Sequence, residues 1–138
     1  MQRTLAALTL LIALGIGARV HAHHAFTAEF DKNKPVSIQG TVKQMDWINP
    51  HSWIYIDVKD DTGKVTEWAV EAANPNSLLR RGFTKQSLPA GVEIRVEGFQ
   101  AKDGATRMSG SKLTYVKDGK SLFMGSSGTG APIETEPK

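Results

Sequence analysis

Three histidines are the residues of this chain best suited to metal chemistry. His23 and His24 are adjacent, and His51 follows within residues 46–53. When a chain begins with histidine, its α-amine and its imidazole lie on one residue and can chelate Cu(II), which favours nitrogen ligands in a tetragonal arrangement. The α-amine has an ordinary pKa of about 7.7–8.0, so it loses its proton to a metal at little cost near neutral pH. A third nitrogen from His24 or His51 would complete a Cu(II) site.

A blander interpretation of these residues stays open. His23 and His24 can simply be a polar, mobile chain start, and His51 can hydrogen-bond its own turn, because adjacent histidines alone are a weak metal signal. Three methionines could serve as soft Cu(I) ligands, although scattered methionines in strands more often fill a core. These are Met45, Met108 and Met124.

His23 can begin the chain only if the protein is exported and cleaved. Arg3 gives a positive start, and residues 5–18 are an uncharged run that is long enough for a signal peptide and too short to span a membrane. Residues 20–22 supply the small or branched side chains of a cleavage site. We therefore expect residues 1–22 to be a signal peptide, and the mature protein to be periplasmic with no membrane span.

Charge and cysteine content narrow the class of protein. The chain has 17 Lys and Arg against 14 Asp and Glu, and residues 1–22 contain two of the basic residues and no acid. The mature chain would thus carry 15 against 14 with no long basic run, which argues against a nucleic-acid partner. Cysteine is absent, so a hydrophobic core must hold the chain without disulfides. We expect one monomeric domain.

Alternating strands predict the surroundings of residues 46–53. Residues 36–42 and 54–58 alternate apolar and polar side chains, which is typical of half-buried strands. Between them, two tryptophans flank Asn-Pro-His, and proline is excluded from central strands. We predict a tight, partly buried corner there, followed by a hairpin loop and a third strand over residues 64–72.

A short helix is predicted after the third strand. Asn74 suits its N-cap, Pro75 its first position and Gly82 its left-handed stop. Leu78 and Leu79 are expected to close one end of the domain.

The order of elements predicts the fold class. Three strands and the helix are followed by strands near residues 92–97 and 105–116, with a small sixth segment near 122–124. This order is that of an all-β, OB-like, five-stranded Greek-key barrel with one short helix between strands three and four. The predicted organisation is an N-terminal arm (23–34), the OB-like domain (35–124) and a disordered tail (125–138).

Several motifs together resemble a family of small exported bacterial proteins of unknown function. The resemblance covers nearly all of the mature chain and implies a periplasmic OB-like domain without an established reaction. Phe83 stands where the family pattern suggests tryptophan. The motifs are His23-His24-Ala25-Phe26, Gly40-Thr41-Val42, Trp47-Ile48-Asn49-Pro50-His51-Ser52-Trp53, Asn74-Pro75-Asn76, Arg80-Arg81-Gly82-Phe83 and Val96-Glu97-Gly98-Phe99.

A second hypothesis is a ligand face on the second and third strands. Alternation places two aromatic and two acidic side chains on one face: Trp53, Tyr55, Glu67 and Glu71. OB-folds bind oligosaccharides or oligonucleotides on this face, but carboxylates repel phosphates, so a carbohydrate, a peptide or a small cation fits better. Alternatively, Phe26 and Phe30 of the arm cover the two aromatic rings.

The sequence favours a binding module over an enzyme. It has no cysteine nucleophile, Gly-x-Ser-x-Gly elbow, phosphate loop or His-Glu-x-x-His motif. Glu67 and Glu71 would lie about 13 Å apart along a strand, too far for a glycosidase pair. We expect a small ligand, a metal ion or a periplasmic protein as partner, with Cu(II) as the candidate metal. Copper redox chemistry would be the one route to activity.

Overall fold

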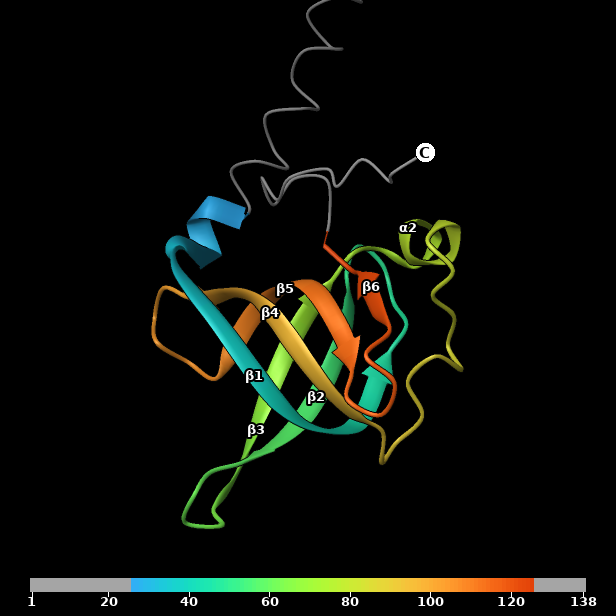
Figure 1. Cartoon of the computed structure of the whole chain (residues 1–138). Coiled ribbons are helices and arrows are strands. Elements are labelled where there is room, and N and C mark those ends of the chain that lie inside the picture. The colour runs from blue at the N-terminus through green and yellow to red at the C-terminus, as the bar shows by residue number, and fades with distance from the viewer. Residues whose placement is uncertain (1–25, 126–138) are drawn as a thin grey trace, which may run out of the picture.

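A computed structural model describes residues 26–125 (Figure 1). A helical turn over residues 26–29 leads into six strands, and one short helix separates the third strand from the fourth. The elements are β1 (Phe30–Asp46), β2 (Ser52–Lys59), β3 (Val65–Ala72), α2 (Pro75–Arg80), β4 (Glu93–Ala101), β5 (Arg107–Tyr115) and β6 (Ser121–Phe123).

The six strands form one mostly antiparallel sheet. Their order is β3-β2-β1-β4-β5-β6, and β3 also pairs with β5 in parallel through Ala69, Val70 and Glu71. The predicted all-β class and the position of the helix between the third and fourth strands are therefore confirmed. The segment β6 adds a short antiparallel strand to β5.

Strand β1 is much longer than the alternation over residues 36–42 indicated. Its first part pairs with β4 from Phe30 to Thr41, and its last part pairs with β2 from Thr41 to Asp46. Gly40 lies where the strand changes partner, and a Cβ atom there would collide with the carbonyl oxygen of Asp57. A side chain at this position would therefore push β1 and β2 apart.

The core is built from the inward side chains of the strands. The predicted inward residues Ile38, Val42, Ile54, Ile56 and Val70 are all buried, because a strand turns alternate side chains to opposite faces. Met108 and Met124 are also fully buried in this cluster, which confirms the core-filling interpretation for them.

Helix α2 has the predicted ends but buries only one of its two leucines. The side chain of Asn74 accepts a hydrogen bond from the backbone N–H of Ser77 at 2.9 Å, and Gly82 has φ +80°. Leu78 is fully buried, whereas Leu79 is 51% exposed, so the expectation that both close the domain was wrong. Adjacent residues point in different directions around a helix, and six residues offer only one buried face.

No helix within residues 26–125 is long and apolar enough to cross a membrane.

Candidate functional site

His51 lies in the corner between β1 and β2, directly before Ser52. The Asn49–Pro50 peptide in this corner is cis. The imidazole is 35% exposed, and its Nδ1 atom lies 3.2 Å from Oε1 of Glu71 on β3. His51 therefore contacts a neighbouring strand and makes no side-chain hydrogen bond within its own turn, as far as residues 26–125 describe it.

Sheet register explains why the corner histidine meets Glu71. Trp53 pairs with Glu71, and His51 precedes Trp53 by two residues, so His51 and Glu71 are diagonal neighbours on the same face. The contact has the distance of an ion pair, but Nδ1 has no well-directed hydrogen bond to any described residue. The two side chains are therefore in contact without a well-directed hydrogen bond between them.

The Glu71 carboxylate is largely shielded from solvent. Its side chain is only 15% exposed, and burial raises the pKa of its carboxyl above the ordinary range. The electrostatic interaction with His51 lowers the pKa of Glu71, the negative charge of Glu29 raises it, and the positive charge of Arg107 lowers it. Groups from the corner, the N-terminal turn and β5 thus act on one carboxyl group.

The N-terminal turn at residues 26–29 is fastened to the loop between β4 and β5. Nη2 of Arg107 lies 3.2 Å from Oε1 of Glu29 and 3.4 Å from Oδ2 of Asp103. The backbone N–H of Lys102 donates to the carbonyl of Glu29 at 3.0 Å, and its Nζ donates to the carbonyl of Thr27. These contacts surround a cavity of about 440 Å³.

The phenylalanines of the N-terminal segment pack against each other and against Phe99 of β4. The ring of Phe26 lies 5.8 Å from that of Phe30 and 5.9 Å from that of Phe99, measured between centroids. Among the described residues, neither ring contacts the ring of Trp53 or Tyr55. The alternative in which these two phenylalanines cover the aromatic face stays a prediction.

The four residues of the predicted ligand face do share one side of the sheet. Trp53 pairs with Glu71 and Tyr55 with Ala69, while Glu67 lies opposite Asp57. Both aromatic side chains are half-buried. Burial raises the pKa of the Tyr55 hydroxyl, and the nearby Asp46 carboxylate raises it further.

The two acids of that face have different surroundings. Glu67 forms an exposed ion pair with Lys43 at 2.5 Å, whereas Glu71 contacts His51 at 3.2 Å. One end of the face therefore carries the exposed pair of Glu67 and Lys43, and the other end lies next to the corner.

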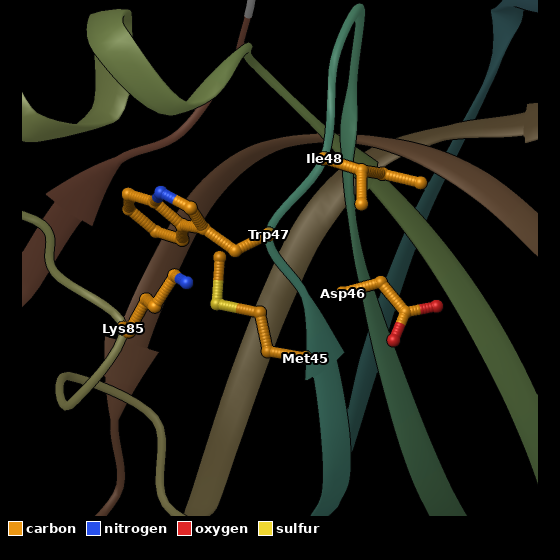
Figure 2. Close-up of a pocket in the computed structure, with 5 residues that line it drawn as sticks. All are labelled: Met45, Asp46, Trp47, Ile48 and Lys85. Atoms are coloured by element: carbon orange, nitrogen blue, oxygen red, sulfur yellow. The ribbon is translucent and has the colours of Figure 1, made fainter.

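A second cavity lies between the end of β1 and the loop after α2. It has a volume of about 240 Å³ and is lined by Met45, Asp46, Trp47, Ile48 and Lys85. Figure 2 shows the thioether of Met45 and the amine of Lys85 beside the ring of Trp47, with Asp46 and Ile48 pointing elsewhere. No histidine lines this cavity, and an ammonium group there would repel a metal cation, so it does not extend the metal hypothesis.

His51 does not have a complete ligand set within the described part of the chain. Across residues 26–125, no group of three or more His, Cys, Asp or Glu side chains is arranged to hold a metal ion. His23 and His24 lie outside the described residues.

Two residues of this region, Arg107 and Glu29, were missed by the sequence reasoning. Neither stands in a recognisable motif, and their contact depends on how the N-terminal turn folds onto the loop between β4 and β5. The contact between His51 and Glu71 was also missed. Its one signal is the hairpin loop before β3, which sets the register of β2 and β3 but does not say how the corner places the His51 ring.

Known proteins give a family but no activity. No curated protein and no solved structure matches this chain. The model of a family described as "Family of unknown function (DUF6152)" matches residues 11–111, which is more than half of the chain. The family resemblance carried by the motifs is thereby confirmed: this chain belongs to DUF6152, a family of unknown function.

Proposed function

We propose that this protein is an exported, periplasmic copper-binding module. In this proposal Cu(II) is held by the α-amine and imidazole of His23 and by His51, with His24 as a further nitrogen ligand. The contact between His51 and Glu71 is the observation that carries the proposal. Metal-binding histidines usually direct one ring nitrogen to a carboxylate, which orients the ring and leaves the other nitrogen for the metal. Here Nδ1 faces Glu71, so Nε2 is the atom available to the ion.

The position of the N-terminal turn supports a site shared with the chain start. Glu29, at the end of the turn, is close enough to influence the carboxyl of Glu71, which contacts His51. His23 precedes Phe26 by three residues, a length that spans at most about 10 Å. In this proposal, a chain beginning at His23 has to bring its amine to His51 within that reach of Phe26.

The proposed closure of the sheet into an OB-like barrel also favours a site at His51. We propose that β1 to β5 close as an OB-like barrel, which is supported by the parallel pairing of β3 with β5 and by the position of α2. OB-folds bind their ligands with the loops between strands one and two and between strands four and five. His51 lies in the first of these loops, and Arg107 directly follows the second.

Copper titration of the chain that begins at His23 tests this function. We expect one Cu(II) per chain with a nitrogen-rich tetragonal EPR spectrum. His51→Ala should lower the affinity at least about tenfold and reduce the nitrogen coupling, because losing one ligand costs more than losing an outer partner. A chain with one alanine added before His23 should lose similar affinity, because the amine then leaves the histidine.

Asn76→Ala on the exposed side of α2 is the matched control, and it should bind copper as the wild type does. If His51→Ala and the extended chain both bind like the wild type, the shared site is wrong. Intact-mass measurement of the exported protein gives the true chain start, and a start at Thr27 would exclude the amine of His23.

The aromatic face of β2 and β3 supports a second candidate function. Trp53 pairs with Asp46 on one side and Glu71 on the other, so its half-exposed ring lies between two carboxylates. Such a face fits carbohydrate hydroxyls or the basic groups of a peptide. Trp53→Ala should abolish binding of neutral oligosaccharides or basic peptides while the fold is retained. An unchanged binding isotherm would exclude this face.

A further inference from the structure

The cavity at the end of β1 includes none of the residues assigned to copper or to the aromatic face of β2 and β3. It has a volume of about 240 Å³, and the loop after α2 contributes its other side. Figure 2 shows the ring of Trp47, the thioether of Met45 and the amine of Lys85 next to one another. The cavity therefore combines an apolar wall with one positive charge.

The apolar wall of this cavity is held by the core of the domain. Trp47 and Met45 are both half-buried and pack against the core cluster. Met45 pairs with Ile54 of β2, which is fully buried, so this end of β1 is fixed to the sheet. Because each side chain is half-buried, part of its apolar surface faces the cavity, where a planar ring can pack on it.

Lys85 is carried by a turn that is fastened to the body of the domain. The backbone N–H of Thr84 donates to the Ser87 hydroxyl at 2.8 Å, and the N–H of Ser87 donates to the Thr84 carbonyl at 3.0 Å. The Tyr115 hydroxyl of β5 donates to the Ser87 carbonyl at 2.8 Å. Phe83, directly before the turn, is fully buried. The backbone at Lys85 is therefore fixed, and its amine reaches the cavity on a flexible stem.

The charge of Lys85 is not neutralised by the acid that lines the same cavity. The Asp46 carboxylate accepts a hydrogen bond from Nε2 of Gln44 at 3.3 Å and raises the pKa of the Tyr55 hydroxyl, so it faces other groups. Figure 2 shows Asp46 pointing away from Lys85. No ion pair within residues 26–125 includes Lys85. A negatively charged ligand can therefore approach this ammonium group without displacing a protein carboxylate.

We propose that this cavity binds a small aromatic carboxylate, with its ring against Trp47 and Met45 and its carboxylate on the Lys85 ammonium. A ring matches the wall, because aromatic rings and thioethers pack favourably on aromatic surfaces. The ammonium group favours a carboxylate over a neutral ring or an amine. The volume is below the roughly 300–1,000 Å³ of sites for drug-sized ligands, so a single ring fits better than a peptide segment.

Titration of the metal-free protein with benzoate tests this site by proton–nitrogen NMR. The chain has three tryptophans, so the indole N–H signals report separately on Trp47, Trp53 and Trp68. We expect saturable shifts of the Trp47 signal, while the other two stay in place because neither residue lines the cavity. Benzamide keeps the ring without the charge, and it should bind about two- to fivefold more weakly, as expected for loss of one exposed ion pair.

Two variants separate the roles of the charge and the wall. Lys85→Gln should lower benzoate affinity about two- to fivefold and leave benzamide affinity unchanged. Lys64→Gln, in the loop between β2 and β3, removes an equal charge outside the cavity and should bind both ligands as the wild type does. Trp47→Leu should weaken both ligands at least about fivefold, followed through the Met45 methyl signal. Thermal unfolding of each variant checks that the fold is retained.

The outcomes decide this site independently of copper binding, because every titration uses metal-free protein. Equal benzoate affinity in Lys85→Gln and the wild type would overturn the site, as would Trp47 shifts that do not saturate. A short peptide ending in a free phenylalanine carboxylate is the competing ligand. If it shifts the Trp47 signal with at least about tenfold higher affinity than benzoate, the cavity recognises a chain end, and the assignment to a small aromatic acid fails.

Discussion

Two arginines of this domain have contrasting surroundings. The Arg81 guanidinium donates to the carbonyl of Gly125 at 2.6 Å and lies 4.7 Å from the ring centroid of Phe123, so it joins the end of α2 to β6. Arg107 has two ion pairs, yet its Nε is buried without a hydrogen bond in the described chain.

The contrast between the two arginines shows where a ligand site can be sought. Near Arg81, the residue before the N-cap of α2 is also bonded to the residue after β6, because the Ala73 N–H donates to the Met124 carbonyl at 2.8 Å. Around Arg107, a buried carboxylate and two unsatisfied nitrogens remain. Satisfied groups stabilise a fold, whereas the buried Nε–H of Arg107 is a donor that an acceptor such as water could satisfy.

The largest effect is expected in the core beside α2. Leu78→Ala removes a fully buried side chain and should lower the free energy of unfolding by about 2–5 kcal/mol. Leu79→Ala is the matched control, because its exposed side chain should matter by less than about 0.5 kcal/mol. Urea unfolding measures both. Equal losses would show that α2 packs differently from the structure described.

The next largest effect is expected on the Cu(II) affinity of the candidate site. Glu71→Gln keeps the shape of the side chain but removes the charge beside His51, and it should lower Cu(II) affinity about 10–100-fold. Glu67→Gln on the same face is the control, because Glu67 pairs with Lys43 and does not contact His51. Copper competition titration compares them. Equal affinities for both variants would remove the distinction between the two ends of the face.

Arg81→Met should lower stability without changing copper binding. Losing one hydrogen bond and one cation–π contact should lower the free energy of unfolding by about 1–2 kcal/mol. Copper affinity should stay unchanged, because no contact links Arg81 to His51 in the described residues. A lower copper affinity in Arg81→Met would break the comparison between the two arginines.

The smallest effect is a pH dependence in the hairpin between β2 and β3, remote in sequence from both arginines. A hydrogen bond from the Thr62 hydroxyl lowers the pKa of Asp60, and backbone N–H groups of Thr62, Lys64 and Gly63 contribute. The carboxylate thus stabilises the fold above its unfolded pKa of about 3.9, and this contribution is lost as the pH falls through the lower folded value.

Asp60→Asn should therefore slightly flatten the decline in unfolding midpoint between about pH 5 and pH 2. Thr62→Val should act in the same direction, since it removes the hydroxyl donor. Neither variant should alter copper binding. A steeper acid dependence in either variant would contradict the assigned pKa direction.

Local patterns in the sequence predicted most of the fold. Alternation identified the inward residues Ile54 and Ile56, and the cap residues Asn74 and Gly82 located α2. Alternation and capping depend on a few neighbouring residues, so they predict strands and helix ends without knowledge of the rest of the chain. The outward positions of Trp53 and Glu71 followed from the same period of two.

The full extent of β1 was not predictable in the same way. Phe30 and Pro35 carry no alternating pattern, yet they join the strand because β4 provides a pairing partner for them. The exposure of Leu79 likewise depends on which face of α2 meets the core. In both cases the deciding contact comes from a distant element.

By itself, the sequence determined the order of strands and helix along the chain, the helix caps, the corner at His51 and the family to which the chain belongs. Only the tertiary structure brought Glu71 to His51 and Arg107 to Glu29. The physical reason is that secondary structure follows the period of neighbouring side chains, whereas these ion pairs depend on sheet register, on the parallel pairing of β3 with β5, and on docking of the N-terminal turn.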